Sequence, residues 1–178
     1  MSQRAVRRRL GALSGAAALA ATLVWSGPAA ADVTFVQASD ALTDLAPGVA
    51  NVTDGASADV YAIGTDDRTT LILVVSGLDE GAVGETFGAH VHTGACVPGN
   101  GAAAGPHYNI GGTPSPETEV WLDFTVLPGG YAFSQTTVPF AIPAGAAHSV
   151  VIHAEPTQLD GGSPGAAGAR MACLPVDF

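Results

Sequence analysis

Histidine is scarce in this chain, and its positions have the spacing of a metal site. Five histidines occur among 178 residues. His90 and His92 are two residues apart in GAHVH, so on a β-strand both imidazole rings project from the same face. The small residues Gly88 and Ala89 precede them and leave space around the rings. This spacing suits two ligands of one shared metal ion.

Two further histidines lie where strands and loops can bring them to the same place. His107 follows in the long segment containing GPHYN, and His153 ends the apolar run SVVIHA. A single histidine is more often a hydrogen-bonded core or surface residue than a ligand, and H-x-H alone is a weak motif. Four that can converge are more specific, and four imidazoles suit Cu(II), with Zn(II) as a competitor. His148 begins the strand that His153 ends and faces the other side, so we expect it to be structural or exposed.

The elements that must position these histidines have the pattern of β-strands. Apolar and polar residues alternate in EVWLDFTV and again in YAFSQTTV, and LPGGY between them predicts a hairpin turn at 128–130. With 23 Gly and 12 Pro and no helical period, we expect an all-β fold of seven or eight antiparallel strands in a sandwich or barrel. Two connections, residues 93–118 and 155–169, are too long for hairpins and are where a site would be built. The other expected strands are ADVYAIG, TLILVVSG, GAHVH, HSVVIHA and RMACLPV.

Residues 1–31 have the composition of a secretory signal peptide. Four arginines within residues 4–9 precede an apolar stretch at 10–25, and small residues follow at Ala29 and Ala31 as in a cleavage site. The stretch is shorter than the ~20 residues that a membrane span needs. We therefore expect residues 32–178 to be exported as one domain without a membrane span, either secreted or retained at the cell envelope. The export route, general secretory or twin-arginine, stays open.

Beyond residue 31 the charge is strongly negative. Arg68 and Arg170 are the only cations there, against 16 carboxylates, which gives a formal charge of −14. Such a surface repels nucleic-acid phosphates and anionic lipid. We expect neither as a partner, and the sequence carries no signal for an oligomeric state.

The chain has two cysteines, Cys96 and Cys173, both in the part expected to be exported. An oxidising compartment favours a structural disulfide over a metal-binding or catalytic pair. Two separate buried thiols are the alternative.

Four segments, taken in order, resemble the copper/zinc superoxide dismutases. VSGLDEGAVGETFGAHVHTGAC, GPHYN, HSVVIHA and GAAGARMACLPV resemble the copper-ligand strand, the bridging-histidine loop, the last copper strand and the arginine–cysteine segment of that family. The resemblance covers most of residues 57–178. It implies an eight-stranded Greek-key β-barrel or sandwich, with a Cys96–Cys173 disulfide and Arg170 as the guide for a small anionic substrate. The copper ligands that it implies are His90, His92, His107 and His153.

The chain departs from this family at the zinc site. After His107 it continues YNIGGTPSPETEVWLD, with no histidine until His148, whereas the family uses two more histidines and an aspartate there. Asp123 could be that aspartate, but the alternation of EVWLDFTV places it in mid-strand. We therefore expect a copper-only member without zinc. The second ring nitrogen of His107 then needs another partner, and the candidate carboxylates are those of Glu117, Glu119 and Asp160.

The resemblance implies an exported copper-dependent enzyme that converts superoxide to oxygen and hydrogen peroxide. His107 would deliver protons and Arg170 would hold the anion. Two alternatives stay open. A non-catalytic copper-binding or copper-buffering protein would keep the four histidines but would not need Arg170. A structural or adhesive β-domain without metal would be expected to lose at least one ligand.

Overall fold

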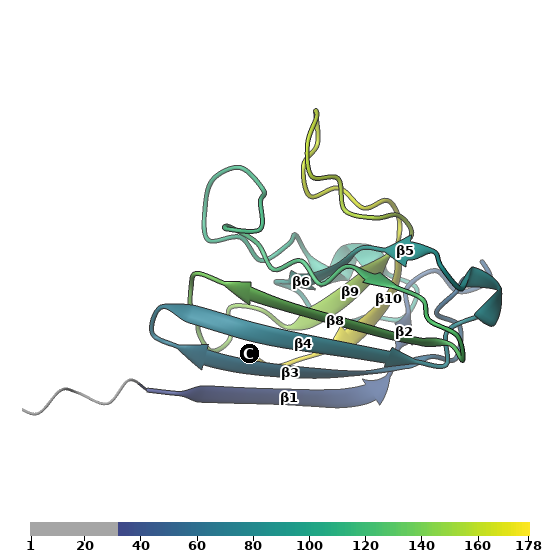
Figure 1. Ribbon diagram of the computed structural model, residues 1–178, viewed down its shortest axis with the longest axis horizontal. Helices are drawn as coiled ribbons and strands as arrows, with labels where there is room; N and C mark the ends of the chain where they lie inside the picture. Colours follow the sequence, from purple (N-terminus) through teal and green to yellow (C-terminus); the bar gives the residue numbers. More distant parts are fainter. Residues whose placement is uncertain (1–31) are drawn as a thin grey trace, which may run out of the picture. The chain divides into compact units, whose positions relative to one another are not determined.

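Residues 32–178, which the computed structural model describes, fold almost entirely into β-strands (Figure 1). The predicted signal peptide, residues 1–31, lies outside the described residues. No α-helix occurs in residues 32–178. The 3-10 helices found there are too short to cross a membrane. The strands are β1 (Thr34–Ala41), β2 (Thr43–Asp44), β3 (Ser57–Thr65), β4 (Arg68–Ser76), β5 (Thr86–Phe87), β6 (Ala89–His92), β7 (Phe124–Thr125), β8 (Tyr131–Val138), β9 (Ser149–His153) and β10 (Arg170–Pro175), with 3-10 helices η1 (Glu80–Ala82) and η2 (Gly101–Ala104).

Eight of these strands form two four-stranded antiparallel sheets. One has the order β1-β3-β4-β8 and the other β2-β10-β9-β6, while β5 and β7 pair separately. Figure 1 shows the first sheet lying in front of β9 and β10. Within the described residues each sheet keeps two edge strands, so the sheets do not close into a barrel. The prediction of an antiparallel all-β fold is confirmed. Of the two predicted architectures, a barrel or a sandwich, the sandwich fits this sheet arrangement.

The core lies between the two large sheets. Buried and partly exposed side chains alternate along β3 and β4, as expected for strands with one face on the core. In contrast, all five residues of β9 are buried, because β9 is a central strand with a second, smaller cluster on its other face. That cluster consists of Leu45, Ala104, Val151 and Cys173. The long loop that carries η2 therefore packs directly on the sheet that contains the histidines.

A disulfide between Cys96 and Cys173 fixes this loop to β10. The predicted pairing is confirmed, and its partners are 77 residues apart. In the chain-entropy model, closing a loop of this length stabilises the folded state by roughly 4 kcal/mol. The bond anchors the start of the loop from which His107 approaches the sheet.

Residues 119–126 differ from the predicted strand. Only β7 forms a strand there, while Glu119 and Trp121 make single bridges to Asn109 and His90. The period of two reflects burial instead, because every second residue from 120 to 126 lies in the core. The turn at 128–130 is present, and Leu127 donates its backbone N–H to the Tyr131 carbonyl at 2.7 Å. Beyond this turn the hairpin prediction is wrong, since β7 pairs with β5 and β8 with β4.

Candidate metal centre

Four of the five histidines converge on one point. Each offers one ring nitrogen, and these nitrogens lie within 4.8 Å of one another. His90 and His92 project from β6, which pairs with β9, and His153 is the last residue of β9. His107 arrives from the loop after η2 and forms a backbone bridge with His92. His90, His92 and His153 are buried and His107 is half-buried. We call these residues the four-histidine cluster.

The ring nitrogens of the four-histidine cluster face one another in two pairs. Nδ1 of His90 lies 3.0 Å from Nε2 of His107. Nε2 of His92 lies 3.3 Å from Nε2 of His153. Which of these nitrogens carries a hydrogen is decided by the partner of the other nitrogen on the same ring.

For His92 and His153 that partner is a backbone carbonyl. Nδ1 of His92 lies 3.1 Å from the oxygen of Gly105, and Nδ1 of His153 lies 3.3 Å from the oxygen of Gly168. A carbonyl only accepts hydrogen bonds, so Nδ1 carries the hydrogen on both rings. Their Nε2 atoms therefore present lone pairs to the centre of the cluster.

For His107 the partner is a buried carboxylate. Nδ1 of His107 lies 2.7 Å from Oε2 of Glu119, which also accepts from Trp121 Nε1 at 2.8 Å. Asn109 Nδ2 donates to the other oxygen, Oε1, at 3.0 Å. Burial by itself would raise the pKa of Glu119, but these three donors together hold it below its usual value. Glu119 is thus an ionised acceptor, and Nε2 of His107 presents its lone pair to the cluster.

For His90 the partner is a hydroxyl. Nε2 of His90 lies 2.6 Å from Oγ1 of Thr157, and Thr157 donates its own hydroxyl hydrogen to Oδ1 of Asp123 at 2.6 Å. Oγ1 therefore accepts from His90, so Nε2 carries the hydrogen and Nδ1 keeps a lone pair. Four lone pairs then converge without a hydrogen between them. This donor set fits a metal cation.

The buried histidines are also held in the neutral form that metal binding requires. Burial lowers the pKa of His90 far below its usual range. Burial likewise lowers the pKa of His92 to about 3 and that of His153 to about 4. At neutral pH these rings do not have to lose a proton before they bind a metal ion.

Of the three carboxylates considered for His107, the structure brings Glu119 to it. Glu119 is only 3% exposed, whereas Glu117 and Asp160 lie on the surface. The sequence feature that separates Glu119 from the other two carboxylates is its place in the alternating run EVWLDFTV, since Glu117 and Asp160 lie outside that run. Nothing in the sequence indicated that Thr157 would contact His90.

Arg170 is the first residue of β10 and stands opposite His153 in the β9–β10 ladder. Its Nη1 donates to the carbonyl of Gly101 at 2.6 Å. The side chain lines a shallow surface groove together with Gly105, whose carbonyl holds His92. Among residues 32–178 it forms no salt bridge with a carboxylate. A cation with free donors therefore lies beside the four-histidine cluster.

His148 does not join the cluster. Its side chain is 42% exposed and its Nδ1 lies 3.8 Å from Oδ1 of Asp177. It provides a reference histidine outside the candidate site.

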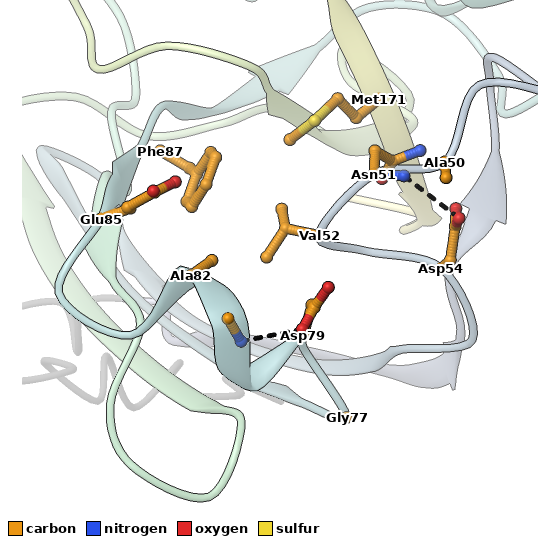
Figure 2. A pocket seen from close by; sticks show the side chains of 11 residues that line it. Ala50, Asn51, Val52, Asp54, Gly77, Asp79, Ala82, Glu85, Phe87 and Met171 are labelled. Atoms are coloured by element: carbon orange, nitrogen blue, oxygen red, sulfur yellow. Dashed lines mark hydrogen bonds between the residues drawn. The ribbon is translucent and has the colours of Figure 1, made fainter.

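A second surface pocket lies away from the histidines, between residues 50–54, residues 77–87 and Met171 (Figure 2). Two of its three acidic residues, Asp54 and Asp79, accept hydrogen bonds within local turns. Asp54 accepts from the backbone N–H of Asn51 at 3.1 Å, and Asp79 caps η1 by accepting from Gly81 at 2.8 Å. The one group of potential metal ligands found in the described residues is the four-histidine cluster.

No protein-family model matches the chain, and no curated protein matches it. The site is therefore characterised by its geometry and chemistry alone. Four imidazoles in one cluster, three of them buried, with a cation beside them, can hold a transition-metal ion next to a place for a small anion.

Proposed function

We propose that the chain is an exported, copper-dependent superoxide dismutase without a zinc site, on a Greek-key β-sandwich of the copper/zinc superoxide dismutase type. In this reaction two superoxide anions and two protons give one molecule of oxygen and one of hydrogen peroxide. The observation that carries the proposal is the convergence of four imidazole lone pairs, each fixed by a hydrogen bond at the opposite ring nitrogen.

Copper, when bound, would supply the one-electron chemistry, because imidazole ligands support both Cu(II) and Cu(I). His92 and His153 are held by backbone carbonyls and serve as fixed ligands. His107 approaches from a loop and is the least buried of the four. Its Nε2 can take up a proton when no metal ion is bound to it. The Glu119 carboxylate, 2.7 Å from Nδ1 of the same ring, balances the charge that this proton adds.

The absence of zinc is supported by what faces the second nitrogen of His107. In the family that the sequence resembles, this nitrogen binds zinc. Here Glu119 takes that place, and Asn109 and Trp121 hold its carboxylate. A carboxylate that orients a histidine in this way is a common partner around metal sites.

Catalysis, rather than copper storage, is supported by Arg170. Its guanidinium lies beside the cluster with a single backbone acceptor and no carboxylate partner among the described residues. A permanent cation in this position can hold a small anion near the histidines. A copper-buffering protein would have no use for it.

Export is supported by the disulfide and by the sequence of residues 1–31. Disulfides such as Cys96–Cys173 persist in oxidising compartments outside the cytosol. The protein would then act as an antioxidant, secreted or held at the cell envelope.

Metal analysis together with a dismutase assay tests the proposal. After reconstitution with both metals, the purified protein should hold one copper per chain and no tightly bound zinc, and should dismutate superoxide. His92→Ala should remove copper and activity but keep the fold, whereas the matched control His148→Ala should keep all three. Copper binding without activity would favour the buffering alternative, and failure to bind copper would leave a metal-free β-domain.

A further inference from the structure

Thr157 connects the loop of residues 155–169 to the four-histidine cluster. It lies in the buried part of this loop and is 8% exposed. Both oxygens of Asp123 hold it, since Oδ2 accepts from the Thr157 backbone N–H at 2.8 Å and Oδ1 accepts from its hydroxyl at 2.6 Å. The hydroxyl oxygen lies 2.6 Å from Nε2 of His90.

These contacts fix the direction of the hydrogen bond to His90. A hydroxyl has one hydrogen, and here Asp123 receives it. We infer that Thr157 is a positioning residue, whose hydroxyl, oriented by Asp123, selects the Nε2–H tautomer of His90 and thereby presents Nδ1 to the metal. The inference rests on the proposed function only because Thr157 would act at the metal site that the proposed function uses.

The partner of His90 differs in kind from those of the other three histidines. A carbonyl or a carboxylate can only accept, so Gly105, Gly168 and Glu119 determine the tautomer by themselves. A hydroxyl can donate or accept, so Thr157 needs a second group to set its direction. Asp123 cannot accept a hydrogen bond from His90 directly, because its Oδ1 lies 3.8 Å from Nε2 of His90, beyond hydrogen-bond distance.

The chain around Gly88 allows the loop to reach this position. The backbone N–H of Gly88 donates to the carbonyl of Glu155 at 2.9 Å. A Cβ at residue 88 would stand 3.1 Å from Oγ1 of Thr157 and 2.6 Å from Cβ of Ala167. Glycine at this position therefore lets the loop lie close enough for Thr157 to contact a fully buried imidazole.

The test is to read the tautomer of His90 directly in the metal-free protein by long-range nitrogen–proton NMR of the imidazole rings. The unmodified protein should show His90 as the Nε2–H tautomer. Thr157→Val keeps the shape but removes the hydroxyl, so this tautomer preference should be lost. Copper affinity, measured by competition with a chromophoric chelator, should weaken by about ten- to a hundredfold. Thr157→Ser should restore both properties, and Thr137→Val, on the exposed face of β8, should change neither.

Asp123→Asn provides a second test that retains the size of the side chain. The amide oxygen can still accept from the Thr157 backbone, while the amide nitrogen donates to the hydroxyl oxygen. The hydroxyl hydrogen is then free to point at His90 Nε2, so the ring should shift toward its Nδ1–H tautomer. Copper affinity should fall even though the loop stays attached.

The inference is overturned if Thr157→Val keeps the Nε2–H tautomer and binds copper within twofold of the unmodified protein. It is also overturned if Thr157→Ser behaves like Thr157→Val, since packing would then be the cause. If Thr157→Val does not fold, as judged by circular dichroism, the tautomer in Asp123→Asn decides. Because the NMR measurement uses metal-free protein, an inactive enzyme would refute the proposed function without affecting this result.

Discussion

His107 donates its Nδ1 hydrogen to the carboxylate of Glu119 across 2.7 Å. Asn109 and Trp121 donate to the same carboxylate, so its position is fixed from three directions. His107 is the one member of the four-histidine cluster that does not belong to a strand of the two large sheets. Its orientation therefore depends on a buried side chain, whereas β6 and β9 hold the other three.

Replacing this carboxylate should weaken the metal site. In Glu119→Gln the amide nitrogen cannot accept from His107, Asn109 or Trp121, so at least one of these donors loses its partner. We expect copper affinity to fall by about ten- to a hundredfold. Competition titration with a copper chelator measures this change.

Glu117→Gln is the matched control, because Glu117 is exposed and only two residues away. It should leave copper affinity unchanged. Equal affinities for the two variants would show that Glu119 does not support His107.

The metal-free protein should lose stability as the pH falls below about 6.5. The pKa of His92 is lowered to about 3 and that of His153 to about 4 in the folded state, while both return to about 6.5 on unfolding. Between these values the unfolded chain binds more protons than the folded one, so the free energy of unfolding decreases as pH decreases. Above pH 6.5 these groups contribute no pH dependence. Urea unfolding of metal-free protein at pH 7, 6, 5 and 4 measures the effect.

Carboxylates such as Glu119 also destabilise the fold when they are protonated, so the histidine contribution needs its own control. In His92→Ala the decrease in the free energy of unfolding between pH 7 and 5 should be smaller than in the unmodified protein. The same decrease in both proteins would argue against neutral, buried histidines in the metal-free state.

The sequence predicted the elements of the site that depend on local spacing. His90 and His92 follow the period of a strand, and His153 ends a continuous apolar run that is buried on both faces, as expected for a central strand. The roles of Thr157 and Asp123 could not be predicted, because they arise from a contact between segments 34 residues apart in a loop without periodicity. The strand expected at 119–126 shows the same limit, since alternation reports burial and does not identify the partner strand. β1 was not predicted because most of its side chains are exposed, and only Val36 and Ala38 pack against the core, which is too short an apolar pattern to recognise.

Loss of the disulfide should lower the stability of the fold but leave metal binding intact. Replacing Cys96 by Ser and Cys173 by Ala removes a closure that contributes roughly 4 kcal/mol in the chain-entropy model. The melting temperature should fall by on the order of 10 °C for a domain of this size. Copper should still bind, because no ligand is changed. Calorimetry and metal analysis of the double variant measure both properties, and a melting temperature unchanged by reduction would contradict a stabilising role.

The last prediction concerns how a small anion reaches a strongly acidic protein. Residues 32–178 have a formal charge of −14, so the long-range field repels superoxide, and Arg170 is the cation beside the four-histidine cluster. Salt screens interactions over roughly 8–10 Å at physiological ionic strength, so it should weaken the distant repulsion more than the local attraction. The rate constant for dismutation should therefore stay nearly flat or rise slightly with ionic strength. Pulse radiolysis over a range of salt concentrations measures it.

Arg68 provides the matched control for Arg170, because it is the other cation of residues 32–178 and lies on the surface beside Asp67. Both charge reversals, Arg170→Glu and Arg68→Glu, change the net charge by the same amount, so they alter the long-range field similarly. Arg170→Glu should lower the rate constant by about tenfold or more without removing copper, and Arg68→Glu should change it little. Equal effects would show that only net charge matters and would return Arg170 to a structural role. A steep fall of the unmodified rate with salt would instead reveal an attractive field extending well beyond Arg170, which the charge distribution of this chain does not provide.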